Sequence, residues 1–168
     1  MLDIGFGSGE GVIAFAESDP SSTILAVDMH TPGIGDLLAS ISERALGNVR
    51  VVDADVRHVL GVVPEGRLSG VLTFFPDPWP KKRHHRRRLI TASFAESLAL
   101  RVRLGGFWHI ATDWPDYAIA VEEAALASPL WHGGVIARPA WRPETRYERR
   151  GRAAGREPID LWFERVLP

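Results

Sequence analysis

Short apolar runs alternate along the chain with longer stretches in which apolar side chains recur every three or four residues. The short runs predict buried strands, and the longer stretches predict amphipathic helices. Strands are predicted at Met1–Ile4, Thr23–Val27, Val49–Asp53, Gly70–Phe75, Gly105–Thr112, Trp131–Arg138 and Ile159–Val166. Helices are predicted at Ser8–Ser18, with Ser8 as the N-cap, and at Pro32–Leu46, Val56–Val62, Arg86–Arg103 and Pro115–Ala127.

The order of these elements predicts the fold class. Strand and helix alternate up to Ala127, whereas no helix is predicted between the last two strands. Parallel strands require a crossover connection, and strands joined without one run antiparallel. The chain therefore predicts an α/β fold with a doubly wound, mostly parallel, seven-stranded sheet whose final strand is antiparallel. Its 168 residues, 45% of them apolar, fit a single domain over residues 1–168.

The first strand leads into a glycine-rich turn, and ligands on such sheets bind beyond the carboxyl ends of the strands. The turn reads DIGFGSGEG, where Gly5, Gly7 and Gly9 allow a tight bend and leave helix amides free for an anion. Asp28 ends the second strand, where an acid commonly accepts ribose hydroxyls. These features predict a nucleoside cofactor, and the alternative is a tight connection without a ligand.

The glycine spacing distinguishes between cofactors. A dinucleotide fingerprint is G-x-G-x-x-G, whereas this turn is G-x-G-x-G and includes Glu10, which would repel a pyrophosphate. S-adenosylmethionine, whose anionic group is a single carboxylate, fits better, and an NAD-dependent oxidoreductase is the weaker alternative. Asp55, just after the third strand, is placed for the adenine amino group. It equally fits the N-cap of the next helix, and the two roles are compatible.

The fourth strand runs into FFPDPWPKKRHHRRR, from Phe74 to Arg88. Asp77 lies here in a turn stiffened by Pro76, Pro78 and Pro80. A carboxylate at this place accepts from the ring N–H and the amino group of guanine, whereas adenine presents a ring acceptor and is repelled. The alternative is that Asp77 only caps the turn.

Charge is divided unevenly along the chain. Residues 1–80 hold 4 Lys and Arg against 11 Asp and Glu, while residues 81–168 hold 16 against 10. The cations between Lys81 and Arg88 would stand at the positive end of the predicted Arg86–Arg103 helix, so the run indicates an anionic partner. We expect that partner to be RNA, and a solvated surface is the alternative.

The segment over residues 139–158 is too long for an ordinary connection between strands. It includes six arginines together with Trp141 and Tyr147. Cations interleaved with aromatic rings are typical of surfaces that hold phosphates and stack bases. Asp113, at the end of the fifth strand, should reach the same edge of the sheet. The alternative for the segment is a mobile arginine-rich loop.

Several classes of protein are disfavoured by composition. The chain has no cysteine, which excludes disulfides, thiolate metal sites and a cysteine nucleophile. His84 and His85 are adjacent but lack a third ligand at a matching spacing, so we expect no metal. No apolar run approaches 18 residues and no leader is visible, so we expect a cytoplasmic protein without membrane contact. Trp108 and His109 are expected in the core.

Four motifs together resemble those of the bacterial tRNA (guanine-N(7)-)-methyltransferase family. They are GFGSGEG, FFPDPWPKKRHHRRRL, ATDWPDY and PETRYERRG, and they occur in that family's order and approximate spacing over essentially all 168 residues. The resemblance implies a Rossmann-like class I methyltransferase. It implies methyl transfer from S-adenosylmethionine to N(7) of guanine in tRNA, at position 46 of the variable loop, giving 7-methylguanosine.

The resemblance also implies roles for individual residues. The cofactor would be held around the glycine turn by Asp3, Asp28, Asp55 and Asp77, of which Asp77 is also the catalytic residue. N(7) of guanine has a lone pair and no proton to lose, so Asp77 is expected to orient the base and balance its charge, not to act as a base. The expected substrate contacts are Lys81, Asp113, Thr145, Arg146, Tyr147 and Glu148.

Two other functions stay open at this point. One is a methyltransferase that acts on a small molecule, and the other is an RNA-binding protein with a disused cofactor pocket. Members of the family carry some tens of residues before the first strand, so we expect a domain without that extension. Whether the protein is a monomer or a homodimer is not decided by its residues.

Overall fold

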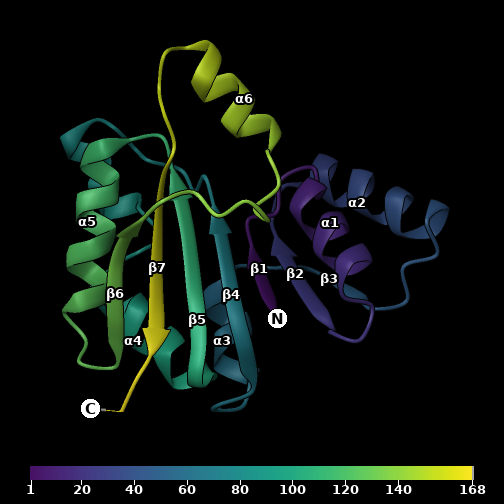
Figure 1. The fold of residues 1–168 in the computed structure, drawn as a ribbon, viewed down its shortest axis with the longest axis horizontal. Coiled ribbons are helices and arrows are strands. Elements are labelled where there is room, and N and C mark those ends of the chain that lie inside the picture. The colour runs from purple at the N-terminus through teal and green to yellow at the C-terminus, as the bar shows by residue number, and fades with distance from the viewer. Residues whose placement is uncertain (168) are drawn as a thin grey trace.

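The computed structural model describes residues 1–167 and has the predicted sheet (Figure 1). Seven strands pair in the order β3-β2-β1-β4-β5-β7-β6, and β7 runs antiparallel to both of its neighbours while the other pairs are parallel. The order reverses direction between β1 and β4, which is where a doubly wound sheet binds its ligand. The strands are β1 (Leu2–Ile4), β2 (Ile24–Asp28), β3 (Val49–Asp53), β4 (Leu68–Phe74), β5 (Val102–Thr112), β6 (Trp131–Ile136) and β7 (Ile159–Arg165).

Helices cover both faces of the sheet, and each face has its own apolar core. Val12 and Leu37 pack with β2 and β3 on one face, and Trp108 and Phe94 lie in the larger core on the other face. Trp108 and His109 are both completely buried, as expected. The helices are α1 (Glu10–Ser18), α2 (Thr31–Glu43), α3 (Val56–Val62), α4 (Ala92–Arg101), α5 (Pro115–Leu126) and α6 (Arg146–Ala153), with a 3-10 helix η1 (Lys82–Arg87).

The predicted Arg86–Arg103 helix is wrong at its amino end. The basic residues form η1, and α4 begins only after Thr91, whose hydroxyl accepts from the Phe94 N–H at 3.2 Å. Arg88 interrupts the helical path because its backbone is extended and its side chain is buried. The cations therefore do not stand in the first turn of α4, and the dipole of that helix does not act on them as predicted.

The amino end of α1 is also different from the prediction. Gly9, not Ser8, is the N-cap, and no side chain caps the helix. Gly9 has a φ of 81°, and a Cβ there would lie 2.7 Å from Leu37 Cδ1, so only glycine fits. The turn is thus closed by backbone geometry. The remaining predicted elements are present, with ends displaced by a few residues.

A helix lies between the last two strands, where none was predicted. After β6, the chain crosses β7, β5 and β4 near the carboxyl ends of the parallel strands and forms α6 (Figure 1). α6 has little apolar surface, which is why hydrophobic periodicity missed it. Its signal was the T-x-x-E pattern of a capping box, of which the structure forms one half: the Thr145 hydroxyl accepts from the N–H of Glu148, three residues later, at 3.2 Å.

Candidate active site at the carboxyl ends of the strands

A cavity of about 460 Å³ opens where β1 to β4 end. Its size is within the usual range for a small-molecule site. The sequence-predicted residues that line it are Gly5, Gly7, Asp28, Asp55, Asp77 and Tyr147. Acids from three successive strand ends therefore meet one cavity, and Tyr147 comes to it from α6.

Asp28 is fixed by the glycine turn that it faces. Its Oδ2 accepts from the Gly7 N–H at 3.0 Å, and its Oδ1 accepts from the Met29 and His30 N–H groups at 2.7 and 2.9 Å. A carboxylate has roughly four acceptor positions, so these bonds leave capacity for one further donor. The carboxylate is thus preoriented at the cavity wall with room for a ligand hydroxyl.

Asp55 both caps a helix and lines the cavity. Its Oδ1 accepts from the Arg57 N–H at 2.9 Å, which confirms the predicted N-cap of α3, and the Arg57 guanidinium pairs with its Oδ2 at 2.9 Å. The side-chain hydrogen bond from Arg57 holds the pKa of Asp55 below its usual range. Asp55 is therefore a carboxylate at neutral pH.

Asp77 lies in a strained turn. Phe75 and Trp79, two residues before and two residues after Asp77, have φ values of 54° and 42°. This left-handed backbone conformation costs a non-glycine residue about 1–3 kcal/mol. The Phe75 N–H donates to Ala111 O at 2.7 Å and holds the turn to β5. The Asp77 side chain is exposed and, among the described residues, makes no hydrogen bond or ion pair. The hydrogen bond to β5 thus holds a strained turn in which the Asp77 carboxylate is available to a ligand.

Part of the basic stretch supports this turn. Arg88 is buried, its Nε donates to Pro78 O at 2.9 Å, and its Nη2 pairs with Asp116 at 2.7 Å, which lowers the pKa of Asp116. Arg87 lies over the Trp79 ring at 4.9 Å and lines the cavity. Arg87 is nevertheless exposed, as are Lys81, Lys82, Arg83 and Arg86.

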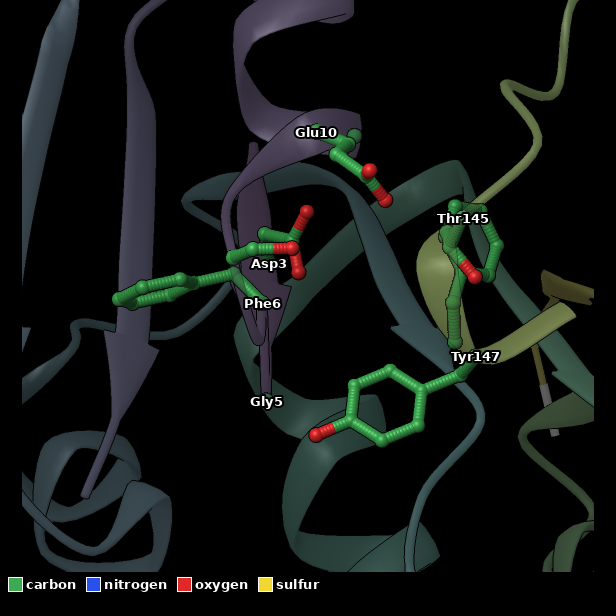
Figure 2. Close-up of a pocket in the computed structure, with 9 residues that line it drawn as sticks. Asp3, Gly5, Phe6, Glu10, Thr145 and Tyr147 are labelled. Atoms are coloured by element: carbon green, nitrogen blue, oxygen red, sulfur yellow. The ribbon is translucent and has the colours of Figure 1, made fainter. Parts of the chain in front are cut away.

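Asp3 faces a second, smaller cavity beside the first (Figure 2). This space of about 20 Å³ is also lined by Glu10, Thr145 and Tyr147. Burial, and then the charge of Asp28, raise the pKa of Asp3 to about 7. Asp3 is thus poised between its neutral and ionised forms near neutral pH, and a cationic group placed beside it would favour the ionised form.

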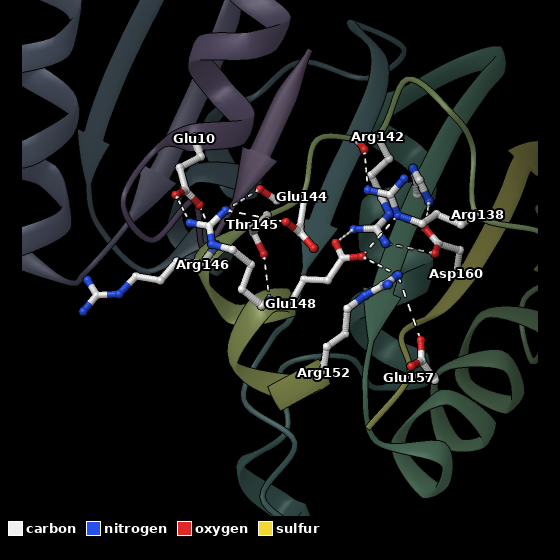
Figure 3. Close-up of polar contacts among 12 residues, drawn as sticks. Glu10, Arg138, Arg142, Glu144, Thr145, Arg146, Glu148, Arg152, Glu157 and Asp160 are labelled. Atoms are coloured by element: carbon white, nitrogen blue, oxygen red, sulfur yellow. Dashed lines mark hydrogen bonds and ion pairs between the residues drawn. The ribbon is translucent and has the colours of Figure 1, made fainter. Parts of the chain in front are cut away.

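Tyr147 connects the two cavities, since its ring lines both. It lies against the glycine turn so closely that a Cβ on Gly7 would be 3.0 Å from its Cε2 atom. The Arg146 N–H donates to Glu10 Oε2 at 2.6 Å, and Arg149 pairs with Glu10 Oε1 at 2.7 Å (Figure 3). Glu10, which the sequence marked only as hostile to pyrophosphate, therefore attaches α6 to α1.

Other predicted site residues do not line either cavity. Gly9 packs under the turn against α2, and Lys81 is exposed on the surface. Asp113 accepts from Arg156 Nε at 2.7 Å and is mostly covered. Glu148 is buried in ion pairs with arginines. The structure thus brings Asp28, Asp77 and Tyr147 together but leaves Asp113 and Glu148 in supporting positions.

The cavity also has walls that the sequence did not reveal. Phe75, Trp79 and Arg87 line it beside Asp77, and Met29 and His30 line it beside Asp28. Each of these residues is next to a predicted one or in the same motif. The sequence feature that could have predicted them is that all of them lie in segments that follow the end of a strand.

Comparison with known proteins agrees with this geometry. A family model described as "Putative methyltransferase" matches residues 1–161. The chain is 43% identical over 170 residues to a tRNA (guanine-N(7)-)-methyltransferase of Alkalilimnicola ehrlichii, covering 98% of this chain and 72% of that one. It is 46% identical over 169 residues to a tRNA (guanine-N(7)-)-methyltransferase of Thiobacillus denitrificans, covering 98% and 74%.

Solved structures with the same fold are much less similar in sequence. An rRNA methylase from Streptococcus thermophilus superposes with a TM-score of 0.68 at 14% identity, over 99% of this chain and 86% of that one. A SAM-dependent O-methyltransferase from Thermotoga maritima gives a TM-score of 0.67 at 14% identity, over 99% and 60%. These likenesses establish the fold.

The sheet has the fold of class I methyltransferases, and the family model that matches residues 1–161 is that of a methyltransferase. Within that class, the chain belongs to the tRNA (guanine-N(7)-)-methyltransferase family. Residues 1–167 contain no cluster of three or more side chains suited to hold a metal ion. In the same range, none of the helices has the length and apolar character needed to cross a bilayer.

Proposed function

We propose that the protein transfers a methyl group from S-adenosylmethionine to N(7) of guanine in tRNA, at position 46 of the variable loop. The observation that supports this most directly is the meeting of Asp28, Asp55 and Asp77 on one cavity, in a chain of this family. The substrate is inferred from the activity for which the relatives are named, and the cavity is the place where the cofactor and the guanine base would bind.

The residues present fit the cofactor. Asp28 keeps an acceptor position for a ribose hydroxyl, and the Asp55 carboxylate faces the cavity where an adenine amino group would donate. Asp3 would face the cationic end of the methionine part. The bound cofactor supplies a methyl group on a sulfonium sulfur. The chain's part is to hold that group in line with the guanine, since alignment alone contributes up to about 7–11 kcal/mol in well-oriented reactions.

Asp77 is the residue assigned to the base. Its free carboxylate would accept from the N1–H and the 2-amino group of guanine, a pairing worth roughly 1–3 kcal/mol of discrimination. N(7) becomes positively charged when it receives the methyl group, and a carboxylate nearby stabilises that charge. No proton has to be removed, so Asp77 orients and neutralises without acting as a base.

The tRNA would lie across the exposed cations on either side of the cavity mouth. Lys81, Lys82 and Arg83 follow the Asp77 turn, and Arg146 and Arg150 are exposed on α6 next to Tyr147. Such cations contact phosphates and position a nucleic acid without reading its sequence.

The test is methyl transfer from labelled cofactor to unmodified tRNA, followed by digestion and identification of the labelled nucleoside. Wild-type protein should give labelled 7-methylguanosine. Asp77→Asn, which keeps the shape of the side chain, should lower the rate roughly 10- to 100-fold.

Asp36→Asn is the matched control, because Asp36 is an exposed aspartate on α2 that does not line the cavity. Label in another nucleoside, transfer to a small molecule without tRNA, or full activity of Asp77→Asn would each contradict the proposal.

A further inference from the structure

Arg142 is completely buried, although it lies in the connection between β6 and α6. Only Trp108 is a larger side chain among the described residues that are buried to this degree. No role was expected for it from the sequence beyond its membership of an arginine-rich segment. A charged side chain in such a place requires partners that justify its burial.

Its guanidinium joins two acids from different elements (Figure 3). Nη1 donates to Glu148 Oε2 of α6 at 2.6 Å, and Nη2 donates to Asp160 Oδ2 of β7 at 3.3 Å. Nε lies 2.7 Å from Asp160 Oδ1 as an ion pair, without the geometry of a hydrogen bond. Asp160 is in turn 2.7 Å from His109 Nε2 on β5, and Arg138 holds the other oxygen of Glu148 at 3.2 Å. Arg142 therefore ties α6 to β7 and, through Asp160, to β5.

The same guanidinium lies against the turn that presents Asp77. Its Cζ is 5.7 Å from the ring centroids of both Phe74 and Phe75. Phe75 has the left-handed backbone that begins the turn, two residues before Asp77. Glu148, bound by Arg142 on its other side, is adjacent to Tyr147 in α6. Arg142 thus contacts Phe75, which lines the cavity, and Glu148, the neighbour in sequence of Tyr147, which lines the cavity from α6.

We propose that Arg142 is a positioning residue for methyl transfer: it fixes the distance between Tyr147 and Asp77, and so the gap in which guanine and cofactor meet. The inference rests on the proposed function. A buried ion pair often contributes less to stability than apolar packing would, but its planar fork satisfies its acceptors in only one arrangement. Arginine at this position provides geometric precision that a leucine or methionine would not.

Glu148 has a positioning role in this arrangement, different from the substrate contact that the family resemblance implied. Glu148 is 1% exposed and is in contact with Arg138, Arg142 and Arg152. It has no surface from which to touch RNA. Glu148 acts through Arg142, by orienting α6 and the tyrosine that precedes it.

The experiment replaces Arg142 with Lys, which keeps the charge but loses the fork. Three quantities are measured: S-adenosylhomocysteine sites per chain, the rate at which S-adenosylhomocysteine dissociates, and kcat and KM for tRNA. We expect about one site per chain. S-adenosylhomocysteine should dissociate about 10-fold faster and kcat should be about 10-fold lower, while KM for tRNA should change less than about threefold. A general loss of structure would instead lower the number of sites.

Tyr147→Ala and the double variant Arg142→Lys/Tyr147→Ala identify the route. If Arg142 acts through Tyr147, the double variant releases S-adenosylhomocysteine no faster than Tyr147→Ala alone, because coupled residues are not additive. The inference would be overturned if the two substitutions multiplied each other's effect on the dissociation rate in the double variant. It would also be overturned if Arg142→Lys left that rate unchanged. Should Arg142→Lys bind no S-adenosylhomocysteine, Glu148→Gln is tested by the same criteria, since it keeps an acceptor for Arg142.

Arg101→Lys is the matched control. Arg101 is a partly buried arginine that donates from Nε to Leu60 O at 2.9 Å, but it lies at the end of α4 away from the cavity. It should leave dissociation and kcat unchanged. Wild-type protein that transfers no methyl to tRNA would contradict the proposed function alone, because S-adenosylhomocysteine release still tests the positioning of Tyr147.

Discussion

Among individual residues, Asp3 is a buried acid whose titration should be visible in the stability of the protein. Its pKa is raised to about 7 in the folded chain and is ordinary, 3.8, when unfolded. The folded state therefore binds more protons between these values, and its free energy of unfolding should fall as pH rises through that range. The upper limit of this decrease is about 4 kcal/mol.

Asp3→Asn removes the ionisation, so the variant should lack this part of the pH dependence. Chemical denaturation at intervals from pH 4 to pH 8 measures it, with Asp36→Asn as the control for removal of an exposed acid. Parallel stability curves for wild type and Asp3→Asn would show that burial does not perturb Asp3. Cofactor affinity should rise over the same pH range, since the ionised carboxylate attracts a cation.

Residue positions after strand ends were predictable, but their contacts were not. Asp28, Asp55 and Asp77 were recognisable because each follows an apolar strand, and parallel strands end at one edge. Glu148 and Asp113 were expected at the substrate by resemblance, and the structure shows in addition that both are partners of arginines. Which arginine reaches which acid depends on how α6 packs on the sheet, and no local pattern in the sequence contains that information.

At the scale of elements, α6 depends on a close approach between Gly151 and Asp113. A Cβ on Gly151 would lie 2.5 Å from Asp113 Oδ2, and Arg156 holds that oxygen at 2.7 Å. Gly151→Ala should therefore displace α6, at a cost of about 1–3 kcal/mol for overpacking. Methyl transfer should fall, and amide exchange within α6 should become faster.

Gly35→Ala is the control for this change, because a Cβ on Gly35 meets nothing within 4 Å. Asp113→Ala in the same chain as Gly151→Ala removes the oxygen that collides, and it should restore slow exchange in α6. Unchanged exchange in Gly151→Ala, or no rescue in the double variant, would show that α6 is not seated by this contact.

Helices and strands that are stabilised by burial of apolar side chains were predicted well, whereas those stabilised by polar contacts were predicted poorly. All strands were found from their apolar runs, because a strand covered on both faces needs such side chains. α6 was missed because arginine contacts and the Thr145 cap stabilise it. The Arg86–Arg103 helix was extended too far because Ile90 and Phe94 continue a helical spacing across a break made by the burial of Arg88.

At the scale of the whole molecule, the sheet gathers charge that is dispersed along the chain. Exposed cations of η1 and α6 lie on either side of the cavity, while acids line its interior. Replacing Lys81, Lys82 and Arg83 together with Gln should weaken tRNA binding. It should also flatten the dependence of log affinity on log salt by roughly 0.7–0.9 for each tRNA phosphate that is no longer neutralised.

Titrations of tRNA at several salt concentrations measure that slope. Arg67→Gln/Arg103→Gln is the control, since both residues are exposed near the amino ends of β4 and β5, at the edge opposite the cavity. An unchanged slope in the triple variant would show that this run faces water when tRNA is bound.

The burial of Arg88 has a consequence for any scan of the basic run. Arg88 looks from the sequence like one more phosphate ligand, yet its guanidinium holds Pro78 and Asp116 underneath the turn. Arg88→Ala would inactivate the protein by releasing the strained backbone of the turn. Alanine at Lys81, Lys82 or Arg83 would instead weaken the binding of nucleic acid. Two causes of failure therefore lie side by side in one stretch of like charges, and only a binding assay kept separate from turnover distinguishes them.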